Sequence, residues 1–225
     1  MEQTLKKYFG YETFRPLQKD IIQHVLTKED CLVLMPTGGG KSLCFQLPAI
    51  IQEGTAIVVS PLISLMKDQV DSLLANGVAA ELINSSLTPA QITNVMEKAQ
   101  AGSLKLLYIA PERLGVPGFQ EFLQNLKISL IAIDEAHCIS QWGHDFRPDY
   151  LHIAESRREL KAPVTLALTA TATPRVQDDI IRLLGLPHAE RLITGFNRPN
   201  LTLEVFSAPD VKAKLNLVRD FLAQA

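Results

Sequence analysis

The sequence predicts an α/β domain in which a mostly parallel sheet carries helices on both faces. Short runs of apolar and β-branched residues alternate with longer amphipathic stretches, and this alternation is typical of parallel strands joined by crossover helices. The connections between the runs are short, and the chain has no internal repeat and no low-complexity segment. A glycine-rich turn follows the first predicted strand, as in sheets that bind a ligand beyond the carboxyl ends of their strands.

The predicted elements follow one another in a regular order. Residues 1–9 predict a short amphipathic helix that Gly10 ends, and Pro16 opens a second helix that reaches about residue 25. The predicted strands are residues 31–34, 55–60, 80–84, 105–110, 129–134, 164–169 and 191–194. The predicted helices between and after them are residues 43–51, 62–76, 89–101, 119–126, 150–160, 174–184 and 211–223.

Composition limits the class of protein. The 225 residues are 47% hydrophobic and 20% charged, as in an ordinary soluble globular protein, and no apolar run reaches membrane-spanning length. The first residues lead into no apolar signal-peptide core, so we do not expect export. Cys31, Cys44 and Cys138 form no CxxC pair, which favours reduced, buried thiols over a zinc site. A net charge of −2 argues against binding nucleic acid over the whole surface but leaves room for a local basic groove.

A phosphate-binding loop is predicted at residues 35–42, where the sequence MPTGGGKS joins a strand to a helix. Glycines let backbone N–H groups converge on phosphate oxygens, and the helix N-terminus adds partial positive charge. The predicted cradle consists of Thr37, Gly38, Gly39 and Gly40. We expect Lys41 to reach the β- and γ-phosphates of a nucleotide and Ser42 to bind Mg²⁺. Met35 stands where the usual pattern GxxxxGK[ST] has glycine, and an ordinary flexible turn is the alternative interpretation.

Two adjacent carboxylates end the predicted strand at residues 129–134. This apolar strand brings Asp134 to the carboxyl edge of the sheet, where open α/β folds bind their ligands. Asp134 would hold Mg²⁺ directly or through water, and Glu135 would orient or deprotonate the attacking water. The alternative is a solvated acidic turn. Because a phosphate loop precedes the pair in the same predicted sheet, we expect Lys41, Asp134 and Glu135 to form a catalytic set.

An adenine-binding segment is predicted before the phosphate loop. Gln18 lies beside the buried face of the second predicted helix and offers both a donor and an acceptor, as an adenine edge requires. Tyr11 and Arg15 would stack on the ring. The alternative is an amphipathic helix whose glutamine faces solvent.

Several other segments carry residues suited to nucleic acid. At residues 59–62 and 109–114, a predicted strand end is followed by proline and the start of a helix. Backbone N–H groups at these two junctions, together with Lys67 and Arg113, are suited to contact nucleic-acid phosphates. Plain strand-to-helix turns are the alternative. Residues 166–172 end a strand in small hydroxyl residues, which would approach the carboxylates and relay the nucleotide state by hydrogen bonds; a simple strand end is the alternative.

One loop concentrates aromatic and basic side chains. The loop at residues 138–148 contains Trp142, His144, Phe146 and Arg147. Aromatic faces beside an arginine form a stacking surface for unpaired bases. A structural mini-core under the sheet is the alternative.

Together these stretches resemble the first motor domain of RecQ-family DNA helicases, within superfamily two of RNA and DNA helicases. The motifs that carry the resemblance are FGYETFRPLQ at 9–18, MPTGGGKS at 35–42, DEAHCISQWGHDFRPDY at 134–150, LTATA at 168–172 and FNRPNL at 196–201. The aromatic-rich loop directly after DEAH sets RecQ proteins apart from related RNA helicases. Loops of superfamily two often lack the first glycine, so Met35 is no departure from this family.

The resemblance implies a P-loop NTPase domain of the RecA-like type over residues 1–205, and a linker or the start of a truncated second RecA-like domain at residues 206–225. It implies ATP and Mg²⁺ as cofactors, with adenine sandwiched by Tyr11 and Arg15 and its edge read by Gln18. The residues implied to sense single-stranded DNA and signal to the ATP site are Trp142, His144, Phe146 and Arg147.

The activity implied is ATP-driven 3′ to 5′ translocation on single-stranded DNA and duplex unwinding in DNA repair and recombination. The implied partners are single-stranded or partially duplex DNA and the second RecA-like domain, with no membrane. We expect a monomer in the cytoplasm, associated with the nucleoid if the protein is bacterial. The second domain would supply an arginine finger, which is worth a factor of about 10³ to 10⁵ in GTPases. We therefore expect this chain alone to bind nucleotide weakly and hydrolyse it poorly.

Three alternatives stay open. One is an RNA helicase of the DEAD/DEAH type, and another is a nucleotide-gated nucleic-acid-binding module without turnover. A small-molecule P-loop kinase is more distant, because no segment resembles an acceptor-binding lid.

Overall fold

The computed structural model describes residues 1–160, 163–195, 202 and 204–224. The chain divides into two compact units, Met1–Gly195 and Phe196–Ala225. The FNRPNL motif lies outside the described residues. The domain assignment, with a boundary at residue 205, stays a prediction.

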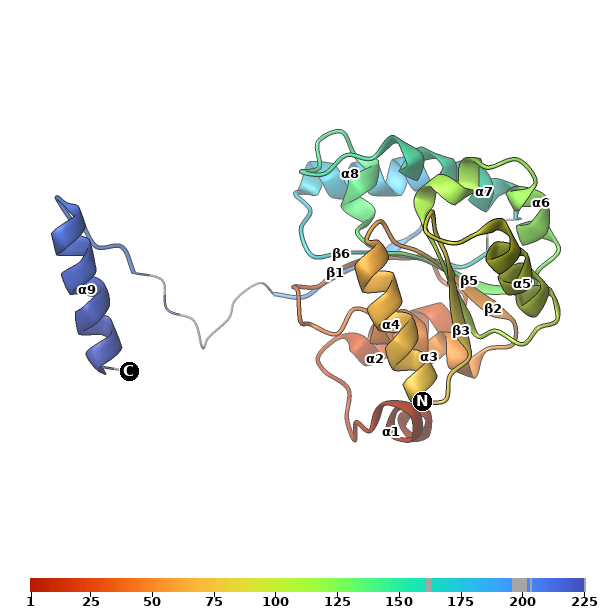
Figure 1. The fold of residues 1–225 in the computed structure, drawn as a ribbon, viewed down its shortest axis with the longest axis horizontal. Helices are drawn as coiled ribbons and strands as arrows, with labels where there is room; N and C mark the ends of the chain where they lie inside the picture. The colour runs from red at the N-terminus through yellow and green to blue at the C-terminus, as the bar shows by residue number, and fades with distance from the viewer. Residues whose placement is uncertain (161–162, 196–201, 203, 225) are drawn as a thin grey trace. The chain divides into compact units, whose positions relative to one another are not determined.

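The described part of the first unit is built on a seven-stranded sheet whose paired strands are all parallel (Figure 1). The strand order is β3-β4-β2-β5-β6-β1-β7. The strands are β1 (Cys31–Leu34), β2 (Thr55–Val59), β3 (Ala80–Ile83), β4 (Leu106–Ile109), β5 (Ile128–Ile133), β6 (Thr165–Thr169) and β7 (Glu190–Ile193). Each lies within one or two residues of a predicted strand, so the predicted parallel sheet is confirmed.

Two helices of the first unit precede β1, and the others connect successive strands. They are α1 (Glu2–Phe9), α2 (Gln18–Leu26), α3 (Leu43–Ile51), α4 (Ile63–Ala75), α5 (Pro89–Gln100), α6 (Phe119–Gln124), α7 (Leu151–Glu159) and α8 (Pro174–Leu184). Within the described residues, three short 3-10 helices span Pro111–Gly115, Ala136–Ile139 and Pro148–Tyr150. None of the described helices combines the length and the apolar character that a membrane span requires.

The two faces of the sheet bury two separate apolar clusters, because side chains alternate along each strand. On β1, Leu32 and Leu34 belong to the cluster under α5, α6, α7 and α8, whereas Cys31 and Val33 belong to the cluster under α2, α3 and α4. Every residue of β1 is therefore buried. The predicted cover of helices on both faces is confirmed.

A buried polar cluster closes the amino edge of the sheet. The Arg157 guanidinium lies 2.6 Å from the Asp30 carboxylate and donates to Thr165 Oγ1 and to the Gly185 carbonyl. Asp30 also accepts a hydrogen bond from the Thr165 backbone N–H at 2.7 Å. These contacts join α7 and the end of α8 to the entrances of β1 and β6.

The second unit contains the helix α9 (Val211–Gln224), where a helix was predicted at residues 211–223. The rings of Phe206 and Phe221 pack edge to face at 5.4 Å, and Asp210 accepts the Ala213 N–H near the start of the helix. Apolar side chains such as Leu215 and Leu222 are exposed on this unit.

Candidate functional site

A cleft of about 700 Å³ lies at the carboxyl edge of the sheet, beside the ends of β1 and β5. The predicted nucleotide and metal residues that line it are Tyr11, Arg15, Gln18, Thr37, Gly38, Gly40, Lys41, Ser42, Asp134 and Glu135. Gly39 is in the predicted set but does not line the cleft. The fold thus brings together side chains from the N-terminal segment, the glycine loop and the end of β5.

The glycine loop is a tight turn that forms hydrogen bonds with itself. The Gly39 N–H donates to the Pro36 carbonyl at 2.9 Å, and the Lys41 ammonium donates to the Met35 carbonyl at 3.2 Å. Gly38 and Gly40 have φ angles of 78° and 86°, a region that side chains other than glycine rarely adopt. The Lys41 ammonium has three donors and uses one of them here, so the others are left for a ligand in the cleft.

Met35 occupies the position at which the usual pattern has glycine, and its side chain points into the core. It is 2% exposed and packs in the apolar cluster that also contains Cys44. The core accommodates this side chain, so the loop keeps its tight turn without the first glycine.

The N-terminal segment is hydrogen-bonded directly to the glycine loop. Gln18 accepts the Arg15 backbone N–H at 2.8 Å and donates to the Gly40 carbonyl at 3.1 Å, and the Arg15 guanidinium donates to the Gly38 carbonyl. Gln18 is 3% exposed, so the alternative of a solvent-facing glutamine is wrong. Because an amide has two donor hydrogens and two acceptor lone pairs, Gln18 keeps one of each for a ligand. Tyr11 lies exposed at the mouth of the cleft.

The carboxylates at the end of β5 occupy different environments. Asp134 is buried, and this burial, with the nearby charge of Glu135, raises its pKa to about 6. Glu135 lies 3.3 Å from His137 Nδ1, and the hydrogen bond to His137 holds the pKa of Glu135 below its usual value. Glu135 also has a φ of 47°, in the left-handed region that Leu17 and Lys28 share. The environment thus separates the pKa values of the two carboxyl groups.

The protein groups near Asp134 are too few to bind a cation by themselves, so a cation here would also need oxygen ligands from a bound phosphate. Among the described residues, no group of three or more His, Cys, Asp and Glu side chains converges on a metal position. Asp134 and the Ser42 hydroxyl both line the cleft. Mg²⁺ is usually held by one or two carboxylates together with water and substrate phosphates, so these two residues match that mode.

The aromatic loop lies against the acid pair. Arg147 anchors it: the Arg147 N–H donates to the Cys138 carbonyl, and its guanidinium pairs with Asp145 and reaches the Pro61 carbonyl at 3.3 Å. Trp142 is 61% exposed, so the alternative of a structural mini-core is wrong for this side chain. Phe146 is half-buried.

Stacked histidines connect this loop to the carboxylates. The rings of His137 and His144 stack with centroids 4.1 Å apart. His137 Nδ1 also lies 2.9 Å from Thr169 Oγ1 at the end of β6. A cavity of about 310 Å³ lies beside the stack, and Thr37 and Glu135 line both this cavity and the cleft. Sequence reasoning missed His137 as the connecting residue, although its place in DEAH was the available signal.

The two proline junctions and their basic residues lie outside this cluster for the most part. Arg113 packs over the Phe119 ring at 5.4 Å, whereas Lys67 is exposed on α4. The first junction meets the aromatic loop at Pro61, whose carbonyl accepts a hydrogen bond from Arg147. Contacts of these junctions with nucleic acid stay predictions.

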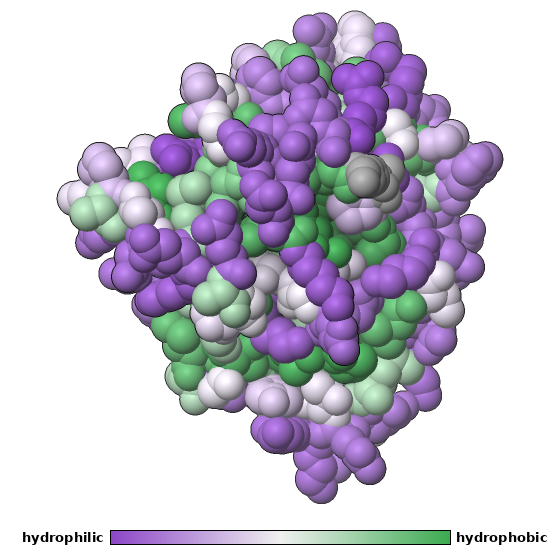
Figure 2. Space-filling model, turned by 90° about the vertical axis from the view of Figure 1, so that its right-hand side faces the viewer, coloured by the Kyte–Doolittle hydropathy of each residue, from purple (hydrophilic) through white to green (hydrophobic). Residues whose placement is uncertain are grey.

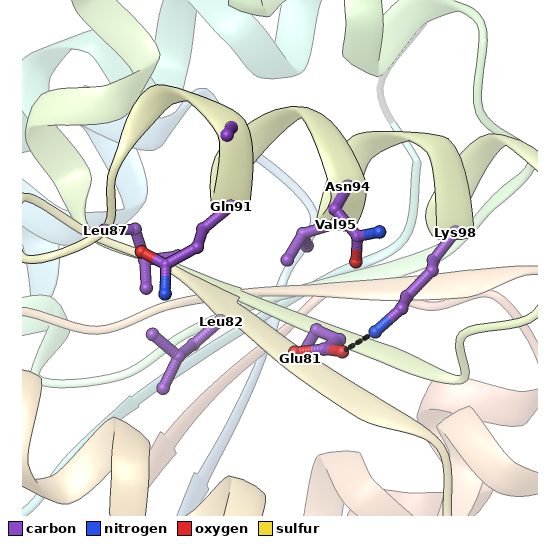
Figure 3. Close-up of a pocket in the computed structure, with 8 residues that line it drawn as sticks. Glu81, Leu82, Leu87, Gln91, Asn94, Val95 and Lys98 are labelled. Carbon is purple, nitrogen blue, oxygen red and sulfur yellow. Dashed lines mark hydrogen bonds and ion pairs between the residues drawn. The ribbon is translucent and has the colours of Figure 1, made fainter.

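A second groove lies elsewhere, between the edge strand β3 and α5 (Figure 3). On the side of the molecule that carries α5, apolar surface lies in hollows between hydrophilic side chains (Figure 2). Leu82, Leu87 and Val95 line the groove, and at one end Lys98 pairs with Glu81 at 2.5 Å. Because the lysine already has a carboxylate partner, this groove lacks the uncompensated positive charge that suits a phosphate.

Comparison with curated proteins gives relatives that are close in sequence. ATP-dependent DNA helicase RecQ from Bacillus subtilis (strain 168) is 52% identical over 203 residues, which cover 89% of this chain and 34% of the relative. RecQ from Haemophilus influenzae is 49% identical over 89% of this chain and 33% of its own length. The probable ATP-dependent DNA helicase RecS of Bacillus subtilis is 46% identical over 97% of this chain and 44% of its own length. The chain therefore spans about a third of the RecQ relatives, and its predicted resemblance to RecQ proteins is confirmed.

Solved structures share the fold at lower identity. The helicase domain of Pyrococcus furiosus Hef superimposes with a TM-score of 0.60 at 24% identity, covering 80% of this chain and 37% of that chain. The DEAD-box helicase Mss116 bound to ssRNA and UDP-BeF gives a TM-score of 0.67 at 20% identity, covering 86% and 43%. These likenesses show that the domain has the α/β P-loop NTPase fold of helicases. Because the model of the DEAD/DEAH box helicase family matches residues 15–180, which is most of the chain, the protein belongs to that family.

Proposed function

We propose that this chain is the N-terminal ATP-binding motor domain of a RecQ-like DNA helicase. The full protein would couple ATP hydrolysis to 3′ to 5′ translocation on single-stranded DNA and to duplex unwinding in DNA repair and recombination, with the polarity taken from the family resemblance. The observation that carries the proposal is the connection between the cleft and the aromatic loop. Glu135, at the cleft, contacts His137, which stacks on His144 of the loop.

The residues of the cleft have complementary roles in binding ATP. Lys41 would donate to phosphate oxygens, and N–H groups of the loop between Thr37 and Ser42, other than that of Gly39, which bonds to the Pro36 carbonyl, would surround them. The remaining donor and acceptor of Gln18 would read the adenine edge, with Tyr11 and Arg15 against the ring. Asp134 and Ser42 would hold Mg²⁺, which would neutralise phosphate charge when bound.

Glu135 is the residue that would act on water. The bond to His137 keeps Glu135 ionised at neutral pH, so its carboxylate accepts a hydrogen bond from the attacking water and then its proton. Asp134, the residue before Glu135, is buried just after the end of β5. Its backbone carbonyl accepts a hydrogen bond from the Tyr150 hydroxyl at 2.9 Å. His137 fixes the Glu135 carboxylate in place.

The aromatic loop would report DNA occupancy to the same carboxylate. A base stacked near Trp142 and Phe146 shifts the loop, and the His144–His137 stack transmits the shift to Glu135 and Thr169. In this way single-stranded DNA would organise the water-activating group.

The chain would work with a second RecA-like domain that follows it and supplies an arginine finger. Its share of the RecQ relatives, 34% and 33%, leaves ample length for such a domain. We propose a monomeric protein that acts in the cytoplasm, on the nucleoid in a bacterial cell. The 225-residue chain alone would bind nucleotide weakly and turn it over slowly.

Trp142→Ala and Phe146→Ala test the coupling. In a version extended through the second domain, both substitutions should reduce DNA-stimulated ATP turnover much more than they reduce nucleotide binding, which a fluorescent ATP analogue measures. Equal losses of turnover and nucleotide binding would mean that the loop is only structural. Competition between single-stranded DNA and RNA is a second arm, and a preference for RNA would replace the DNA helicase with an RNA helicase of the DEAD/DEAH type.

A further inference from the structure

The single tryptophan of the chain is exposed, and an arginine from another element covers one side of it. The Arg175 guanidinium lies 3.3 Å from the centroid of the Trp142 ring. A guanidinium over an indole face is a favourable cation–π contact. Trp142 nevertheless stays 61% exposed, so a large part of the ring remains accessible to solvent.

The backbone next to this ring is fixed to the same helix. Ser140 Oγ donates to the Asp179 carboxylate at 2.8 Å and accepts the Trp142 N–H at 3.1 Å. Arg175 and Asp179 are four residues apart on α8, so they lie on one face of that helix. The helix therefore holds the ring through Arg175 and the backbone of the loop through Asp179.

The charge arrangement around Arg175 is unusual for a helix start. Arg175 follows Pro174 in the first turn of α8, where the helix dipole disfavours a cation. Asp179 on this face is paired with Arg182 at 2.7 Å and with Ser140, and no hydrogen bond or ion pair within the described residues joins it to Arg175, which acts on it only as a nearby charge. The indole of Trp142 is thus the group that receives the Arg175 guanidinium.

We propose that Arg175 is a positioning residue for single-stranded DNA: it holds Trp142 in one orientation, with one face covered, so that the other face is a preformed stacking surface for an unpaired base. The inference rests on the proposed function, because it concerns how the aromatic loop meets DNA. A ring that is already oriented loses less freedom on binding. Planar stacking, and not the charge of Arg175 alone, is what orients it.

The Arg175–Trp142 contact can be tested without DNA. Since Trp142 is the only tryptophan, intrinsic fluorescence reports on this ring alone, and acrylamide quenching measures its accessibility. Arg175→Ala should increase the quenching, and Arg175→Lys should increase it nearly as much. Arg191→Ala is the matched control, because Arg191 pairs with Asp178 at the protein surface. Quenching that is equal in all four proteins would overturn the proposal.

DNA binding is then measured by the anisotropy of a fluorescein-labelled oligothymidylate at low and high salt. Arg175→Ala should weaken binding by roughly three- to tenfold, a fraction of the effect of losing a whole stacked base. The loss should persist at high salt, and Arg175→Lys should resemble Arg175→Ala. In a Trp142→Ala background, Arg175→Ala should add no further loss, because Arg175 acts through that ring.

Three results would overturn the proposal while leaving the DNA-binding role of the loop in place. If Arg175→Lys binds like the wild type and the loss in Arg175→Ala disappears at high salt, Arg175 is a charge contact to phosphate. If Arg175→Ala binds the oligothymidylate more tightly, Arg175 obstructs the access of bases to the Trp142 ring. If binding is unchanged, Arg175 has no role in it. If the wild-type chain binds a fluorescent ATP analogue but neither binds the oligothymidylate nor changes its tryptophan fluorescence, the DNA role under the proposed function fails as well.

Discussion

Buried charged groups lie at both ends of the strands of the sheet, but they are paired at the amino end and poorly paired at the carboxyl end. At the amino edge, Arg157, Asp30 and Thr165 pair with one another, and the guanidinium finds three partners. At the carboxyl edge, burial and the neighbouring charge of Glu135 raise the pKa of Asp134. Satisfied groups stabilise a fold, whereas poorly satisfied or strained groups cost stability and are kept for function. The comparison indicates that one edge holds the domain together and the other is prepared for ligands.

Glu135→Gln should have the largest effect, and only on chemistry. Removing a positioned general base typically costs a factor of about 10² to 10⁴ in rate. In the two-domain version, DNA-stimulated ATP turnover should fall in this range, while affinity for a fluorescent ATP analogue changes little. Near-normal turnover in this variant would show that another residue activates the water.

Arg157→Ala should have the largest effect on stability. It leaves Asp30 partly buried without its cation, which should cost about 3 kcal/mol of unfolding free energy, the lower end for breaking a buried pair because Asp30 keeps some contact with water. Urea unfolding measures the loss. Arg158→Ala, one residue further on the exposed side of α7, is the control and should change stability by less than about 0.5 kcal/mol. Similar losses in both variants would show that the cluster at the amino edge is unimportant.

Asp134→Asn should stabilise the nucleotide-free protein, and the gain should depend on pH. The folded-state pKa of Asp134 is about 6 against an ordinary value of 3.8. The ionised carboxylate therefore costs no stability below the ordinary pKa, an increasing amount as pH rises toward 6, and up to roughly 3 kcal/mol above it. Asparagine removes this cost, so the gain should grow between about pH 4 and pH 6 and then level off.

Urea unfolding in EDTA across this pH range measures the gain. Glu135→Gln is a second arm and should give a smaller gain, because it removes the neighbouring charge that contributes to the raised pKa of Asp134 but also loses the favourable bond to His137. A gain in Asp134→Asn that is the same at every pH would contradict the assignment of a raised pKa.

Much of the fold could be predicted because its signals are local. The seven strands follow from short apolar runs, and the glycine loop and the pair Asp134-Glu135 follow from short motifs at strand ends. Parallel strands place such motifs at one edge, so the assembly of the cleft was also predictable.

The unpredicted features depend on side chains that are distant in the sequence. Arg157 and Asp30 meet across 127 positions, and no local pattern marks either as a partner. The predictions placed Gln18 beside the buried face of its helix, yet its bond to the Gly40 carbonyl depends on how α2 packs against the loop. The contact of Arg175 with Trp142 depends likewise on where α8 meets the aromatic loop.

ATP turnover with and without single-stranded DNA is the most direct test of the claim that this domain is one half of a DNA-driven motor. The measurement compares the 225-residue chain, a version extended through the proposed second domain, and the extended version with Lys41→Ala. We predict strong, DNA-stimulated turnover only in the extended protein, and its loss in Lys41→Ala. Robust turnover and unwinding by the 225-residue chain alone would contradict the need for a second domain. An extended protein that stays silent while nucleotide still changes its DNA affinity would replace the motor with a nucleotide-gated binding module.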